Sequence, residues 1–139
     1  MRRDIIRNKI KEIHESVIMV QSNLPDTLEE FQDLGLVKDG IYKRIEFSIE
    51  NVWDICSIIN SELSSGIPQD EKDIIDNLMK SRILSIDLGE KLKIMKGFRN
   101  IVVHRYGSLD DEIAFLTLHE HLDDFQEFTS QIEDFLSRK

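Results

Sequence analysis

Two long stretches of the chain repeat isoleucine, valine and leucine every three or four residues, and this spacing limits the possible folds more than any other feature. Such steps place side chains on one face of an α-helix, because the helix turns once every ~3.6 residues. Each stretch therefore predicts a long amphipathic helix whose apolar stripe packs into a core. The stripes are Ile6, Ile10, Ile13, Val17, Val20 and Leu24, then Ile41, Ile45, Ile49, Val52, Cys56, Ile59 and Leu63.

Capping and breaking residues divide the rest of the chain into further helices. Pro25 ends the first helix, and the spacing of Thr27 and Glu30 predicts a capped short helix over residues 27–34. Asp39-Gly40 predicts a turn or an N-cap before the second long helix. We expect other helices over about residues 70–80, 87–105 and 109–136, with a loop at 64–68. The prediction is an all-α, antiparallel up-and-down bundle of about four to six helices.

Composition predicts one domain over residues 1–139, with 40% hydrophobic residues to form its core. No apolar run approaches the ~20 residues of a membrane span. The charged start of the chain does not resemble a signal peptide. Cys56 is the only cysteine, so no internal disulfide forms. Together these features predict a reduced, cytoplasmic protein.

The charge of the chain is unevenly distributed. Its net value is −9, which argues against a nucleic-acid ligand because phosphate binding is mainly electrostatic. Residues 90–106 nevertheless carry five cations against the single acid Glu90, whereas residues 108–139 are strongly acidic. A local basic strip on an acidic body can hold RNA, although the same lysines can simply solvate a helix face. The five cations are Lys91, Lys93, Lys96, Arg99 and Arg105.

The segment 99–106 combines the reactive side chains. Arg99 carries a planar guanidinium that matches a phosphate, and His104 carries an imidazole that exchanges protons near neutral pH. Tyr106 adds a phenol two residues further on. Guanidinium and imidazole are sufficient for a ribonuclease that needs no metal, because the 2′-hydroxyl of RNA is itself a nucleophile.

Helical geometry separates the two candidate catalytic side chains. Arg99 and His104 are five residues apart, so they point about 140° away from each other on one helix. Two copies of the helix, related by a two-fold axis, bring both side chains to one phosphate. The spacing therefore favours a composite site in a homodimer.

The run 97–106 resembles the Arg-(four residues)-His-(one residue)-Tyr motif of the HepT-like toxins in the HEPN superfamily. The segment 44–55 is similar to the long central helix of that family. Phe31 and Leu34 resemble its short second helix, and Ile67-Pro68 resembles its loop. The resemblance extends over about residues 5 to 137.

This resemblance implies a role for each matching residue. Arg99 and His104 correspond to the catalytic pair of the family, and Asn100 to the polar residue that orients the site. Tyr106 corresponds to the tyrosine that an MNT-type nucleotidyltransferase antitoxin modifies with AMP to silence the toxin. The family is homodimeric, with the site between protomers. The chain itself would hold no cofactor, since the partner uses the ATP and Mg²⁺.

The sequence also suggests residues that bind RNA, and it leaves one alternative function open. Lys96 and Arg105 are candidates for binding RNA beside the motif. His119 and His121 are two residues apart and face opposite ways on a helix, so we expect no metal site there. The alternative function is a non-catalytic helical binding subunit of a nucleotidyltransferase complex, which the net charge favours and the intact Arg99/His104 pair disfavours.

Overall fold

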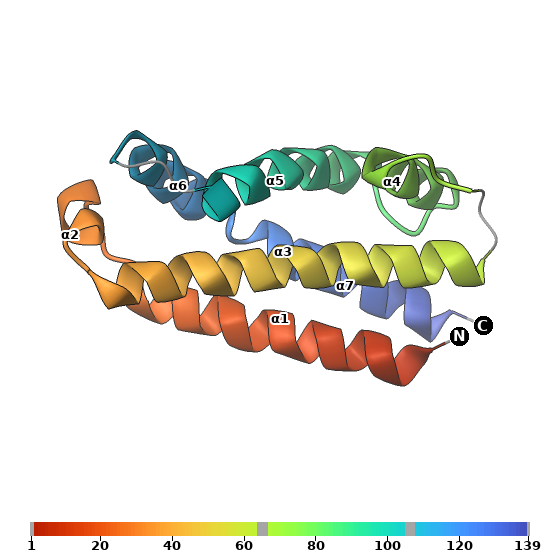
Figure 1. The fold of residues 1–139 in the computed structure, drawn as a ribbon. Helices are drawn as coiled ribbons and strands as arrows, with labels where there is room; N and C mark the ends of the chain where they lie inside the picture. Colours follow the sequence, from red (N-terminus) through yellow and green to blue (C-terminus); the bar gives the residue numbers. More distant parts are fainter. Residues whose placement is uncertain (1, 64–66, 105–107, 139) are drawn as a thin grey trace.

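The structure is a computed structural model that describes residues 2–63, 67–104 and 108–138, with the backbone alone at 100–104 and 108–110. These residues form seven helices and no strand (Figure 1). The all-α fold is confirmed, with one helix more than predicted. The helices are α1 (Arg3–Asn23), α2 (Leu28–Gln32), α3 (Leu36–Glu62), α4 (Glu71–Lys80), α5 (Ile86–His104), α6 (Ser108–His121) and α7 (Asp124–Ser137).

Helix α3 is the centre of the bundle. It runs antiparallel along α1 and also contacts α4 and α5, while α7 packs against α1 and α5 (Figure 1). The short α2 lies against α6. This arrangement surrounds α3 with apolar side chains, which explains why its own apolar surface extends beyond one stripe.

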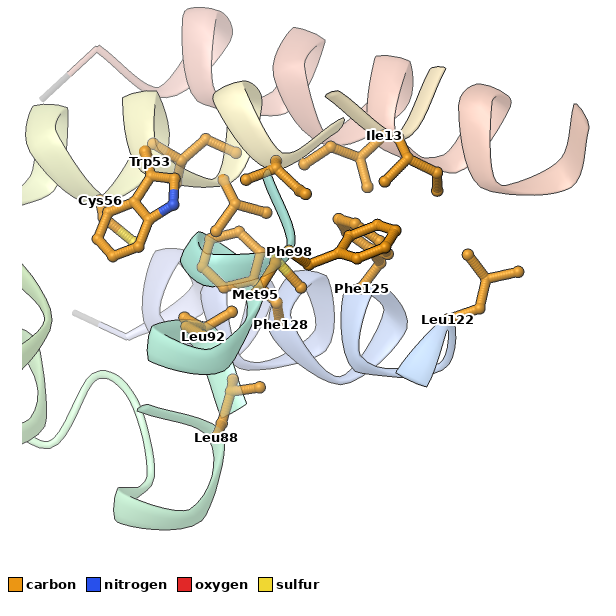
Figure 2. Close-up of a cluster of buried hydrophobic side chains, with 14 of the residues drawn as sticks. Ile13, Trp53, Cys56, Leu88, Leu92, Met95, Phe98, Leu122, Phe125 and Phe128 are labelled. Carbon is orange, nitrogen blue, oxygen red and sulfur yellow. The ribbon is translucent and has the colours of Figure 1, made fainter. Parts of the chain in front are cut away.

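The core lies between α1, α3, α5 and α7, and Figure 2 shows side chains from all four helices meeting there. Cys56 of α3 is fully buried among them, and burial raises the pKa of its thiol. Leu92 of α5 and Phe128 of α7 are likewise inaccessible to solvent. The predicted stripes therefore form a core, as the three- and four-residue spacing indicated, except for Leu63 at the end of the second stripe, which is 40% exposed.

The first helix boundaries follow the predicted chemistry. Helix α1 ends at Asn23, two residues before Pro25. The hydroxyl of Thr27 accepts a hydrogen bond from the backbone N–H of Glu30 at 3.2 Å and donates one to its carboxylate at 2.8 Å. The predicted cap of the short helix is confirmed.

The start of α3 corrects the prediction made from Asp39-Gly40. The helix begins at Leu36, so Asp39 and Gly40 lie inside it. Gly35 occupies the N-cap with φ of 63°, a conformation that glycine adopts without steric cost. The extra turn was missed because Leu36 is 86% exposed and adds nothing to the apolar stripe.

The single helix predicted over 109–136 is wrong, since the chain forms α6 and α7 there with a break at 122–123. Leu118, Leu122 and Phe125 continue the helical spacing across the break. The two segments pack against different neighbours, α6 against α2 and α5, and α7 against α1 and α5. A change of direction lets both apolar faces be buried.

Within the part of the chain that the structure describes, no helix combines the length and the apolar character that crossing a membrane requires.

Candidate active site on helix α5

Helix α5 has an apolar face that fixes it to the core. Leu88, Leu92, Met95 and Phe98 recur every three or four residues along this face, and all four side chains are buried (Figure 2). Burial of such side chains holds the helix rigidly. Arg99 directly follows Phe98, so the candidate catalytic arginine starts from a well-supported backbone.

The side chain of Arg99 reaches α4. Its Nη2 lies 3.5 Å from Oε1 of Glu71, and the arginine side chain is 24% exposed. Its Nε and Nη1 donate no hydrogen bond to the described residues. A guanidinium carries five N–H donors, so the contact with Glu71 uses only part of what Arg99 can offer to an anion.

Glu71 also contacts Lys96, whose Nζ lies 3.9 Å from Oε2 of the same carboxylate. Glu71 stands in the first turn of α4, after Asp70, whose side chain caps that helix by accepting from the N–H of Asp73 at 3.0 Å. One carboxylate on a capped helix end thus orients two cations of α5. Lys96, predicted to bind RNA, is already partly neutralised by it.

Two further cations of the predicted basic strip are neutralised as well. Nζ of Lys91 lies 3.1 Å from the carboxylates of Asp87 and Glu127, and these partners raise its pKa to about 12. Nζ of Lys93 lies 2.8 Å from Asp76, whose hydrogen bond raises the pKa of the lysine. Among the residues with described side chains, every cation from 90 to 99 has an acidic partner. The strip is therefore much less basic than its sequence suggests.

The other residues of the motif are placed less completely. Asn100 and His104 belong to α5, His104 as its last residue, and the description covers their backbones only. Arg105 and Tyr106 lie outside the described residues. Since α5 is continuous from Arg99 to His104, helical geometry still turns the two residues about 140° apart. The composite site between two copies stays a prediction.

Sequence reasoning missed Glu71 as a partner of the site. Acidic residues on α4 meet cations of α5 in antiparallel order, Glu71 with Arg99 and Asp76 with Lys93. This signal becomes readable only when the two helices are known to pair, because the partners are far apart in sequence.

The histidines of α6 have partners within the protein. Nε2 of His119 lies 3.0 Å from the carbonyl oxygen of Pro25, and Nδ1 of His121 lies 3.2 Å from Asp124. Burial raises the pKa of Asp124, although His121 and Lys91 oppose the shift. No group of three or more metal-binding side chains occurs among the described residues.

Comparison with known proteins matches this chain to one protein family. Residues 4–132 match the model of the family described as "Ribonuclease HepT-like". The chain is 33% identical to the mRNA nuclease HepT of Shewanella oneidensis over 130 residues, which is 94% of this chain and 97% of that protein.

Solved structures agree with this match. The tri-AMPylated Shewanella oneidensis HEPN toxin in complex with the MNT antitoxin superposes with a TM-score of 0.83 and 30% identity, covering 94% of this chain and 98% of that one. A mutant of the MntA–HpeT toxin–antitoxin complex gives a TM-score of 0.85 with 32% identity, at the same coverage.

Proposed function

Because this chain belongs to the HepT-like ribonuclease family, we propose that it is a metal-independent endoribonuclease and the toxin of a HEPN/MNT toxin–antitoxin pair. The observation that carries the proposal is Arg99, which Glu71 holds at Nη2 and whose Nε and Nη1 donate to none of the described residues. It lies in the Arg-(four residues)-His-(one residue)-Tyr motif.

The proposed reaction uses the RNA as its own nucleophile. His104 accepts the proton of a 2′-hydroxyl as the oxygen attacks the adjacent phosphorus. The bond from phosphorus to the 5′-oxygen breaks, and that oxygen takes up a proton from a protonated imidazole. The products are a 2′,3′-cyclic phosphate and a 5′-hydroxyl, with no metal ion required.

Arg99 stabilises the charge that builds on the phosphoryl oxygens in the transition state. Since Arg99 and His104 diverge on one helix, a homodimer supplies the arginine of one protomer and the histidine of the other. Asn100 orients the site, and Lys96 and Arg105 flank the RNA.

Silencing is proposed to act on Tyr106. An MNT-type nucleotidyltransferase partner, using ATP and Mg²⁺, adds AMP to its phenol. Bulky negative charge at the mouth of the site then repels the phosphate of RNA. The AMPylated state of the similar Shewanella toxin, solved with its MNT antitoxin, supports this part of the proposal.

RNA cleavage in EDTA by the unmodified protein tests the catalytic proposal. We expect the wild type to cleave, and His104→Ala to lose about 10²–10⁴-fold in rate, the usual contribution of a general acid–base group. His119→Ala is the matched control, since His119 belongs to α6 and bonds Pro25. Equal rates for wild type and His104→Ala would refute the assignment. Failure of the wild type to cleave would favour the non-catalytic binding subunit.

Tyr106→Phe tests the silencing proposal. The variant should cleave RNA like the wild type and escape silencing when incubated with the active antitoxin and ATP. Mass spectrometry would follow the added AMP. Continued silencing of the variant would mean that the antitoxin blocks the site by occupying it.

A further inference from the structure

A second basic site lies at the other end of α5 from Arg99. The connection between α4 and α5 and the C-terminal end of α7 form a groove of about 430 Å³. Of the described residues, Lys80, Arg82 and Arg138 line it, together with one carboxylate, Asp134. Three positive charges against one negative charge make this groove locally basic on a chain whose net charge is −9.

These three cations differ from those of α5 in having no acidic partner among the described residues. Lys91, Lys93, Lys96 and Arg99 each lie within 4.0 Å of a carboxylate. Lys80, Arg82 and Arg138 are exposed and form no such ion pair with a residue that the structure describes. An anion that binds in the groove therefore displaces no internal carboxylate.

The groove is also held in shape by hydrogen bonds between its two walls. Oε1 of Gln131 on α7 accepts from the N–H of Ser85 at 2.8 Å, and its Nε2 donates to the Ser85 hydroxyl at 3.1 Å. Nη1 of Arg138 donates to the carbonyl oxygen of Arg82 at 3.2 Å. These contacts fix the loop wall against α7, so little ordering remains to be done when a ligand binds.

We propose that this groove binds the phosphodiester backbone of single-stranded RNA, as a contact separate from the cleavage site. The proposal rests on the proposed ribonuclease function. The rise of α5 from Ile86 to Arg99 is about 20 Å, so the groove contacts nucleotides well away from the scissile phosphate. None of its described lining residues is aromatic, so they offer no platform for stacking bases. The contact therefore holds RNA without selecting its sequence.

The test compares Lys80→Gln/Arg82→Gln with a matched pair, Lys11→Gln/Arg44→Gln. Lys11 and Arg44 are exposed and lie on α1 and α3, outside the groove. The probe is a long single-stranded 2′-O-methyl RNA, which lacks the nucleophilic hydroxyl and reports binding alone. We expect the groove pair to reduce the magnitude of the negative slope of log K against log salt by about 1.4, since each phosphate contact contributes about −0.7 for single strands. The control pair should leave it unchanged.

Cleavage gives a second readout that separates the groove from the active site. The groove variant should cleave a dinucleotide at the wild-type rate, because that substrate covers the scissile phosphate only, while its KM for long RNA rises. Thermal melting checks that both pairs fold.

Several outcomes would overturn the groove proposal. These are equal losses of binding in both pairs, a parallel loss of dinucleotide cleavage, or unchanged RNA binding alongside weaker binding of an acidic partner protein. Groove-dependent RNA binding by a wild type that cleaves nothing would support the groove while refuting the ribonuclease function.

Discussion

The two faces of α5 are held in place by different interactions, apolar burial on one and ion pairs on the other. On one face, Leu92 and its neighbours are buried in the apolar core. On its flanks, Lys93 and Arg99 remain about one-quarter exposed and pair with carboxylates of α4. The apolar face contributes most of the stability, because exposed ion pairs contribute little on average. The charged flanks can therefore be used for function at small cost to the fold.

The largest expected effect is on the apolar face. Leu92→Ala removes a fully buried side chain and should lower the free energy of unfolding by about 2–5 kcal/mol. Urea denaturation measures the loss. Ile94→Ala on the same helix is the control, because Ile94 is 60% exposed and its truncation should change little. Similar losses for both variants would mean that α5 packs with a different face inward.

Glu71→Gln probes the charged flank near the candidate site. The variant removes the charge that orients Arg99, so we expect kcat for RNA to fall by about tenfold, equivalent to about 1.4 kcal/mol in the barrier. Stability should change by no more than about 1 kcal/mol. Glu90→Gln is the control, since Glu90 pairs with Lys93, at 3.8 Å, and not with Arg99. A rise in activity would show instead that Glu71 competes with phosphate for the arginine.

Two glycines of α5 test how tightly each side of this helix is packed. A Cβ on Gly89 would lie 2.2 Å from Sδ of Met79, whereas one on Gly97 would meet nothing within 4 Å. Gly97→Ala should therefore stabilise by up to about 1 kcal/mol through helix propensity. Gly89→Ala gains the same propensity but overpacks by about 1–3 kcal/mol, for a net loss of about 1 kcal/mol. Urea denaturation should show a higher free energy of unfolding for Gly97→Ala and a lower one for Gly89→Ala. A gain at Gly89 would mean that Met79 moves aside easily.

The smallest effect concerns Lys91 at high pH. Because its pKa is raised from 10.5 to about 12 in the folded protein, its contribution is fully present below pH 10.5 and is lost as the pH rises through 12. Lys91→Gln should therefore show a smaller drop in Tm across this window than the wild type. Parallel curves for the two proteins would show that the contacts with Asp87 and Glu127 do not stabilise the fold.

Local pattern was enough to predict most of the helices. Repeated Ile and Leu and the Thr27 cap act over a few residues, so α1, α2 and α4 were predicted nearly to their ends. The break between α6 and α7 was missed because Leu122 and Phe125 keep the helical spacing across it. Only the packing partners of the two segments explain that break.

The candidate site depends even more on contacts between segments that are far apart in the sequence. The motif residues were found from chemistry in one short segment, and their roles stay predictions. Their electrostatic surroundings were not found, because Glu71 and Arg99 are brought together by the pairing of two helices. A count of charges along the sequence suggested a basic strip, whereas pairing across helices cancels most of it.

The buried thiol of Cys56 has a practical consequence. Since it is the only cysteine and its side chain is closed off in the core, a maleimide or disulfide reagent can reach it only after the bundle opens. Its labelling rate in native buffer thus reports opening of the α3 core, and it equals the opening rate when the reagent reacts faster than the core recloses. The chain carries its own reporter of conformational fluctuation, and the same reagent would show whether the proposed antitoxin or RNA slows those openings.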